Sequence, residues 1–248
     1  MRSVYSAANG LSTFQKRIDT VAHNLANVNT VGFKSSRLDF KDMVYHNIYR
    51  EGVWNPNNNL QMGHGSTVSQ IVRNMEAGKT LPGDMYDVAL EGEGYFAVRM
   101  QDGQIAYTRD GTFQVDHNGQ LLTSRGQAVL DMNGNNIVLG TSQYEIDKNG
   151  MITANGLTVA QLGVFVCDNP KGMSAMGDNM FQPTANSGGM AQAPIGSFRT
   201  MQGYYESSNV DMAQEFTYLI RAQRAMTMVS RALQTADEMD ARANALRQ

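Results

Sequence analysis

The opening segment carries the most regular hydrophobic pattern of the chain. Two sets of apolar residues each recur every seven positions, the second set three places after the first: Val4, Leu11, Ile18 and Leu25, then Ala7, Phe14, Val21 and Val28. This a/d heptad predicts an α-helix with one apolar seam that needs a partner helix. Asn, Thr and Gly residues at positions 27–32 are expected to end it, because Asn and Gly accept the left-handed conformation that closes a helix. The alternative is an ordinary core helix of a globular domain.

A related pattern returns in the last forty residues. Apolar residues again alternate three and four apart, and then change register: Leu219, Ala222, Met226, Val229, Leu233 and Ala236, then Met239, Ala243 and Leu246. Ser208 or Asn209 is expected to cap this helix, with Asp211 in its first turn. We expect the two terminal helices to pair with each other and with other copies. The residues predicted at subunit interfaces are Val4, Leu11, Phe14, Ile18, Val21, Leu25, Val28, Leu219, Met226, Val229, Leu233, Met239 and Leu246.

Between the two helical ends the pattern is that of an all-β domain. Asp-Gly and Asn-Gly pairs separate short apolar runs, and such pairs favour tight hairpin turns. The predicted strands are 87–100, 105–109, 113–116, 120–124, 127–130, 137–139, 144–147, 151–154 and 158–167. Residues 169–193 are expected to form a long loop, with one short strand near 180–182.

The predicted organisation therefore has four parts. An N-terminal helix occupies 1–33, an extended arm 34–80 (with a short strand near 68–72), a β-rich outer domain 81–200, and a C-terminal helix 201–248. The fold class is α+β: a sandwich-like or barrel-like β domain, plus terminal helices that form a coiled-coil-like inner domain.

Composition narrows the function classes. The chain has 248 residues, a formal net charge of −3 and one cysteine, Cys167. With no basic block, nucleic acid is not expected as a partner, and one cysteine excludes an internal disulfide framework. No apolar run is long enough to span a membrane. Because the heptad begins at once, the first residues are not expected to form a cleavable secretory signal.

Residues that could carry chemistry are scattered. His23, His46, His64 and His117 have no metal-ligand spacing among themselves or with Cys167. Residues 131–136 resemble a calcium loop but lack its bidentate acid, and Gly92-Glu93-Gly94 is too short for a dinucleotide fingerprint. We expect no catalytic residue, no metal, no cofactor and no small-molecule substrate, although a pair of distant catalytic carboxylates stays open on this reasoning.

Three blocks of the chain resemble the bacterial flagellar rod and hook proteins. They are HNLANVNTVGFKSSRLDF (23–40), the block from DVALEGEGYF to LLTSRG (87–126), and the block from YESSNVDMAQ to TADEM (205–239). His23 and Tyr205 replace a more usual Asn and Leu, and residues 225–228 replace an aromatic-acidic stretch. The residues that carry the motifs are Asn24, Leu25, Ala26, Asn27, Thr30, Gly32, Phe33, Lys34, Gly94, Tyr107, Arg109, Gly111, Ser208, Asn209, Val210, Gln223 and Arg224.

The resemblance implies a structural protein and not an enzyme. Members of this family polymerise helically into the axial drive shaft of the flagellum, which transmits torque and encloses the export channel. The implied partners are further copies, other rod and hook proteins above and below, a bushing ring, and the flagellar type III export apparatus. The implied location is the basal body outside the cytoplasmic membrane.

Within the family, IDTVAHNLANVNTVGFK, FKDMVYHNI and QTADEM are most similar to distal rod members. The shortness of residues 50–60 leaves a proximal rod paralogue open. A third hypothesis is a secreted β-rich binding or glycan-processing protein that its helices oligomerise. That protein would have a concave pocket with convergent polar groups and a titrating acid pair.

Overall fold

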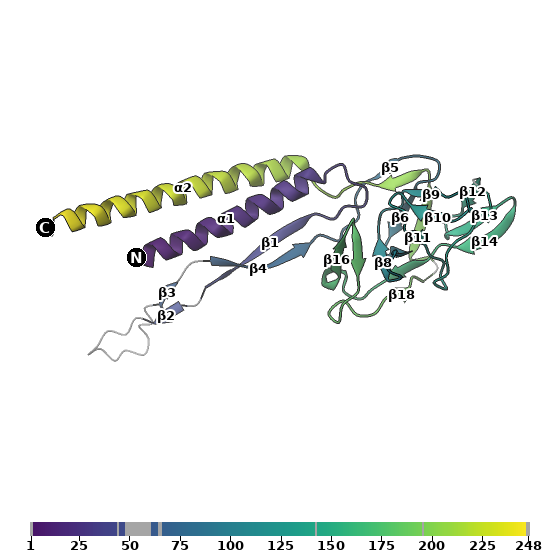
Figure 1. Ribbon diagram of the computed structural model, residues 1–248, viewed down its shortest axis with the longest axis horizontal. Coiled ribbons are helices and arrows are strands. Elements are labelled where there is room, and N and C mark those ends of the chain that lie inside the picture. The colour runs from purple at the N-terminus through teal and green to yellow at the C-terminus, as the bar shows by residue number, and fades with distance from the viewer. Residues whose placement is uncertain are drawn as a thin grey trace. The chain divides into compact units, whose positions relative to one another are not determined.

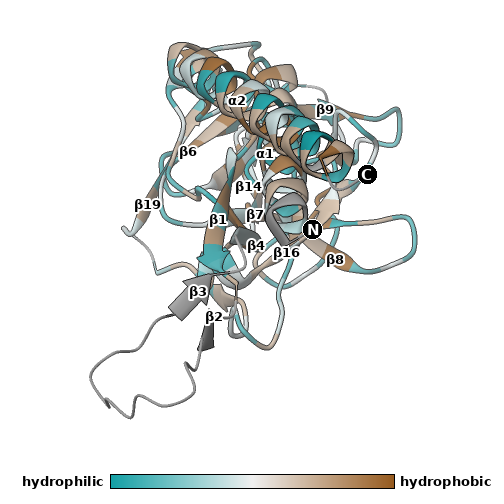
Figure 2. Ribbon diagram, turned by 90° about the vertical axis from the view of Figure 1, so that its left-hand side faces the viewer, coloured by the Kyte–Doolittle hydropathy of each residue, from teal (hydrophilic) through white to brown (hydrophobic). Residues whose placement is uncertain are grey.

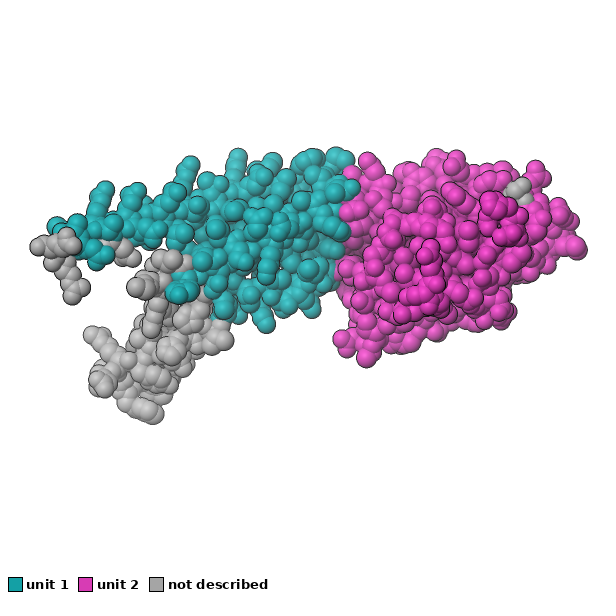
Figure 3. All heavy atoms as spheres, in the orientation of Figure 1, with its two compact units in different colours: residues 1–26, 36–72, 211–248 teal, residues 27–35, 73–210 magenta. Residues whose placement is uncertain are grey.

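The computed structural model describes residues 2–43, 45–47, 61–63, 66–141, 143–194 and 196–246 (Figure 1). The chain is α+β, with one long helix near each end and strands between them. It divides into two compact units (Figure 3). Unit 1 comprises residues 1–26, 36–72 and 211–248, and unit 2 comprises residues 27–35 and 73–210.

Unit 1 is built on two helices, α1 (Arg2–Ala26) and α2 (Met212–Ala245), which pack on each other and run in opposite directions (Figure 1). β1 (Ser36–Asp42) pairs with β4 (Ser66–Arg73) and also contacts α1. β2 (Tyr45–Asn47) pairs antiparallel with β3 (Gln61–Gly63). Much of the predicted arm is thus extended, whereas its turn-rich run at 55–59 lies outside the described residues.

Unit 2 contains the remaining described strands and one 3-10 turn. Its largest sheet has the order β16-β17-β8-β7-β11-β10-β9, with β15 pairing with both β7 and β18. A three-stranded sheet β12-β13-β14 and the pairs β19-β6 and β20-β5 complete the unit. The elements are β5 (Thr80–Pro82), β6 (Val88–Gly92), β7 (Tyr95–Arg99), β8 (Ile105–Thr108), β9 (Phe113–Val115), β10 (Leu121–Thr123), β11 (Ala128–Val129), β12 (Tyr144–Ile146), β13 (Met151–Ala154), β14 (Leu157–Gln161), β15 (Val164–Val166), η1 (Pro170–Gly172), β16 (Ser174–Gly177), β17 (Met180–Gln182), β18 (Ala191–Gln192), β19 (Phe198–Gln202) and β20 (Tyr204–Glu206).

Several strand predictions were wrong in extent. Strand 87–100 is two strands, because the backbone turns at Gly92 and Gly94, which both have positive φ. Strand 158–167 is broken at Gly163, whose Cα lies too close to the Leu130 and Asp131 carbonyls for any side chain. Residues 137–139 make an isolated bridge and no strand. The predicted loop 169–193 contains β16 and β18 as well as the expected β17.

The main core lies in unit 2. Phe96, Val98, Leu121, Ile152 and Leu162 are fully buried members of one continuous apolar cluster, in which the Phe96 ring meets the Phe113 ring edge-on at 5.3 Å between centroids. Burying these side chains supplies the main free-energy gain of folding, at about 1.5–3 kcal/mol for each large aliphatic or aromatic residue. Unit 2 therefore has its own core, as a separate domain requires.

Candidate functional site

The apolar seams of the two terminal helices pack against each other inside unit 1. Along α2, burial recurs every three or four residues as far as Ala236. The buried or half-buried positions include Leu219, Ala222, Met226, Val229 and Leu233 on α2, and Leu11, Phe14, Ile18, Val21 and Leu25 on α1. Because α1 and α2 pack on each other, these side chains already have a partner within the chain. Their predicted contacts with other copies remain a prediction. Val28 is half-buried in unit 2, and the side chain of Val4 is not described.

A polar pair is enclosed within this seam. Asn24, which is 1 % exposed, donates through Nδ2 to Oε1 of Glu215 at 2.9 Å. The same amide group accepts from the Ser36 backbone N–H and donates to the Ser36 carbonyl, so it also links α1 to β1. Oε2 of Glu215 is buried and has no hydrogen-bond partner among the residues that the structure describes. Burial raises the pKa of the Glu215 carboxyl, the nearby Asp211 adds to the rise, and the hydrogen bond from Asn24 opposes it.

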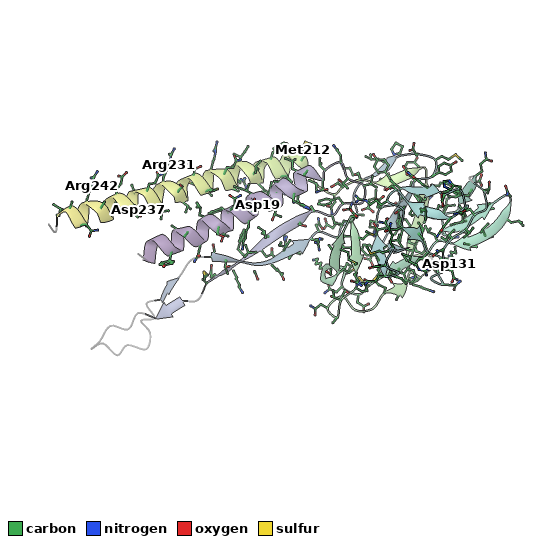
Figure 4. All side chains as sticks on the ribbon, viewed as in Figure 1. Asp19, Asp131, Met212, Arg231, Asp237 and Arg242 are labelled. Carbon is green, nitrogen blue, oxygen red and sulfur yellow. The ribbon has the colours of Figure 1, made fainter. Side chains whose placement is uncertain are left out.

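The opposite side of α2 is exposed and partly apolar. Phe216, Ile220 and Met228 are 45, 50 and 65 % exposed. With Arg224 and Arg231 they form what we call the outer face of α2. Ile220, Met228 and the two arginines line a shallow surface hollow of about 610 Å³. Hydrophobic segments recur along α2 in Figure 2, and Arg231 points away from α1 in Figure 4.

α2 also extends past the first residues of α1 (Figure 1). It has 34 residues and α1 has 25, and every side chain described from Asp237 to Leu246 is exposed. Met239 is 67 % exposed and Leu246 is 90 % exposed. These two predicted interface residues therefore have no packing partner in the described chain. The change of heptad register at Met239 coincides with the end of the α1 contact.

In unit 2, residues from all three sequence blocks meet at one buried carboxylate. Glu206, 2 % exposed, accepts from Lys34 Nζ at 2.6 Å and from Arg109 Nη1 at 3.2 Å. The backbone N–H of Gly78 donates to the same carboxylate. Arg109 is held further by the Leu90 and Gly92 carbonyls, and its guanidinium lies 5.3 Å from the Tyr95 ring centre. Burial lowers the pKa of the Lys34 amine, and the charge of Glu206 opposes that change.

Asn209 connects the same segments through backbone groups. Its side chain accepts from the Ser35 N–H and donates to the Asn74 and Glu76 carbonyls. We call Lys34, Arg109, Glu206 and Asn209 the polar junction. It ties together the three stretches by which the chain enters or leaves unit 2, at 27–35, 73–80 and 204–210. Because Asn209 is engaged here, the cap of α2 is Asp211, which accepts from the Ala213 and Gln214 N–H groups.

Two motif glycines are explained by close approach in this region. Gly32 has φ +66°, and a Cβ there would lie 2.8 Å from the Asp110 backbone nitrogen. Its N–H donates to the Glu206 carbonyl at 2.8 Å. Gly111 faces the Val88 carbonyl with no room for a Cβ. Only glycine fits either position without moving backbone.

Most of the other motif residues lie in turns or are buried in the fold. Thr30 and Asn27 bond to each other in the turn after α1. Phe33, Tyr107 and Ser208 are buried, Val210 is half-buried, and Ala26, Gln223 and Arg224 are exposed. The sequence patterns did not identify Glu206, nor the apolar residues of the outer face, Phe216, Ile220 and Met228. The only signal for Glu206 was a charged residue within the YESSNVD motif at 205–211, and its partners Lys34 and Arg109 lie far away along the chain.

Chemistry in the described part of the chain is limited. No cluster of His, Cys, Asp or Glu there could hold a metal ion, and no helix there has the length and apolarity to cross a membrane. A cavity of about 490 Å³ in unit 2 is lined by Arg109, Tyr95, Cys167 and the exposed acids Glu76 and Glu93, among others. Burial raises the pKa of the Cys167 thiol, and Asp168 adds to it, so that the thiol stays protonated and weakly nucleophilic.

Three family models match the chain in consecutive blocks. "Flagella basal body rod protein" matches residues 4–34. "Flagellar hook protein FlgE/F/G D1 domain" matches residues 89–154. "Flagellar basal body rod FlgEFG protein C-terminal" matches residues 201–246.

Curated relatives match over the full length. The chain is 38 % identical to the flagellar basal-body rod protein FlgG of Borreliella burgdorferi, over 100 % of this chain and 99 % of that protein. It is 36 % identical to FlgG of Bacillus subtilis, over 96 % of each. It is also 30 % identical to the flagellar basal-body rod protein FlgF of Caulobacter vibrioides, over 96 % of this chain and 94 % of that protein.

The polar junction gives the first prediction. Glu206→Gln leaves two buried cations without their counter-charge, so we expect a loss of about 3–5 kcal/mol in the free energy of unfolding. Glu91→Gln, an exposed acid on the adjacent strand β6, is the matched control and should change stability by less than about 0.5 kcal/mol. Urea unfolding followed by tyrosine near-UV circular dichroism measures both. Equal free energies of unfolding for the two variants would contradict the expected contribution of the polar junction to stability.

The enclosed Glu215 gives a prediction about pH. Because its folded-state pKa is raised above 4.5, the folded chain keeps a proton that the unfolded chain loses, and stability falls as the pH rises through that window. Glu215→Gln keeps an acceptor for Asn24 but cannot ionise. The helices of this variant should therefore melt at a higher temperature than wild type at pH 7, and the difference should vanish at pH 3.

Thermal unfolding followed at 222 nm gives the measurement. Glu238→Gln on the exposed end of the same helix is the control, and its melting should follow wild type at both pH values. The explanation fails if Glu215→Gln melts at or below the wild-type temperature at pH 7.

Proposed function

This chain belongs to the family of flagellar basal-body rod proteins, and from that premise we propose that it is a subunit of the distal rod. Copies polymerise helically into the axial drive shaft that transmits torque to the hook and encloses the export channel. The single observation that supports polymerisation is the outer face of α2. Large apolar side chains stay exposed there, although the seam of the same helix is already packed on α1.

An exposed apolar face of this kind on a helix marks an interaction surface. A helical polymer needs two different complementary surfaces on each chain, because a heterologous contact that does not close makes a filament. The outer face of α2 and its end beyond α1 supply two distinct surfaces on one element. In the assembled rod, α1 and α2 form a coiled-coil-like inner domain around the channel. Unit 2, a sandwich-like or barrel-like β domain, lies outside it, and residues 34–80 bridge neighbouring subunits.

The remaining assignments follow from the same premise. The other partners are rod and hook proteins above and below, a bushing ring around the shaft, and the type III export apparatus, which exports the chain. The location is the basal-body rod outside the cytoplasmic membrane, in the periplasm where there is an outer membrane. The chain has no catalytic role, and the secreted binding-protein hypothesis is set aside by the family membership.

The distal position is favoured over the proximal one by the relatives. Identity is 38 and 36 % to two proteins named FlgG and 30 % to one named FlgF. The proximal paralogue is the second candidate, because the FlgF protein also aligns over nearly its whole length.

Self-assembly is tested by pelleting. We expect the purified full-length chain to form sedimenting rods at high concentration. Phe216→Gln with Ile220→Gln should reduce the pelleted fraction by at least about tenfold, because each buried apolar side chain contributes about 1.5–3 kcal/mol and 1.4 kcal/mol is a factor of ten. Sedimentation and negative-stain microscopy measure the amount and the form.

The control makes the same change on an exposed apolar pair of unit 2. Leu157→Gln with Val159→Gln, where the side chains are 73 and 42 % exposed, should pellet like wild type. If the α2 variant polymerises as well as this control, the outer face does not contribute to assembly.

The position along the rod is tested in cells. Expressed in motile bacteria that lack their own distal rod subunit, the chain should restore hook-bearing basal bodies and swimming, whereas cells that lack the proximal subunit should stay non-motile. The reverse pattern would assign the chain to the proximal rod.

A further inference from the structure

Charge is segregated along α2 in a way that the packing on α1 does not explain. From Phe216 to Ala236 the helix carries Arg221, Arg224 and Arg231 and no acidic residue. Three acidic residues then follow within four positions, at 237, 238 and 240. We call residues 237–246 the acidic tip. Its acidic residues lie toward the helix C-terminus, where the helix dipole favours cations, so they do not stabilise their own helix in this way.

These charges lie in register on one side of the helix. Arg224, Arg231 and Glu238 are spaced by seven residues, which places them on one stripe. All three side chains are exposed. In the described part of the chain, none of them, and not Asp237 either, takes part in an ion pair. The stripe therefore runs from basic to acidic, and no ion pair among the described residues neutralises it.

The apolar residues follow the same division. The outer face presents Phe216, Ile220 and Met228 beside its arginines, and the acidic tip presents Met239 and Leu246 beside its acidic residues. The outer face thus combines exposed apolar area with positive charge, and the acidic tip, although it also contains Arg242, combines exposed apolar area with a net negative charge. Because the two surfaces differ, the acidic tip of one copy can bind the outer face of the next. Each added copy then leaves one surface open for a further copy.

We infer that the acidic tip of α2 in one copy binds the basic outer face of α2 in the next copy. This inference rests on the proposed function and specifies one of its contacts. Glu238 faces Arg224 or Arg231, which corresponds to a shift along the helix of fourteen or seven residues, or roughly 21 or 10 Å at 1.5 Å per residue. Met239 and Leu246 add apolar contact. The charge pairs set the register and the choice of partner more than the total affinity.

Charge reversal with rescue tests this contact in the full-length protein. Arg224→Glu with Arg231→Glu should lower the pelleted fraction by about tenfold or more, and so should Asp237→Lys with Glu238→Lys, because like charges then face each other. The chain carrying all four changes should polymerise again. Wild-type polymers should also weaken as salt is raised, since exposed charge pairs are screened.

Two controls separate this contact from other effects. Lys171→Glu with Arg199→Glu reverses two exposed cations of unit 2 and should pellet like wild type. Circular dichroism at 222 nm should show unchanged helix content in every variant, because the altered side chains are exposed.

The outcomes are distinct. If both reversals and the fourfold variant polymerise like wild type, the charge contact is wrong and the rod function stands. If both reversals fail and the fourfold variant does not recover, the two surfaces do not face each other, and the inference is overturned. Closed dimers in place of polymers would also contradict it. Wild-type protein that stays monomeric would contradict the proposed function together with this inference.

Discussion

One buried carboxylate holds together segments that are far apart in the chain. Glu206 is shared by Lys34 and Arg109, which come from the connection after α1 and from the end of β8. A buried charge is costly unless it is paired and hydrogen-bonded, so this arrangement forms only when all three segments are in place. Asn209 adds backbone hydrogen bonds to two of the same stretches. Unit 2 therefore fixes the entry and exit of the chain with polar contacts beside its apolar core, since Arg109 lies over the ring of the buried Tyr95.

α2 shows how one helix can serve two purposes. Its inner side follows the heptad, packs on α1 and encloses the Asn24–Glu215 pair. Its outer side keeps Phe216, Ile220 and Met228 in solvent in the isolated chain. A helix whose apolar residues were needed only for its own domain would bury them in one stripe. The second stripe is consistent with a subunit whose folding is completed by its neighbours.

The sequence blocks that carry the family resemblance contain residues of two kinds: some stabilise the fold of one chain, and others are exposed on its surface. Lys34, Arg109, Gly32 and Asn209 belong to the polar junction or its close surroundings, where charge pairing and the lack of a Cβ decide the residue type. Gln223 and Arg224 lie exposed on α2. Residues of the first kind set the shape of one subunit, and residues of the second kind are free to contact another.

The sequence by itself determined the two terminal helices, the β-rich middle and the family, because heptad spacing, Asn-Gly turns and linear motifs are local signals. Both helices were predicted too long, over 1–33 and 201–248, whereas α1 ends at Ala26 and α2 begins at Met212. Only the tertiary structure decided that Glu206 joins three distant segments, that Asp211 and not Asn209 caps α2, and that strands 87–100 and 158–167 are broken. Each of these depends on which groups meet across the fold, and spacing along the chain does not encode that. The same holds for α2 beyond Ala236, whose exposure follows from α1 being the shorter helix.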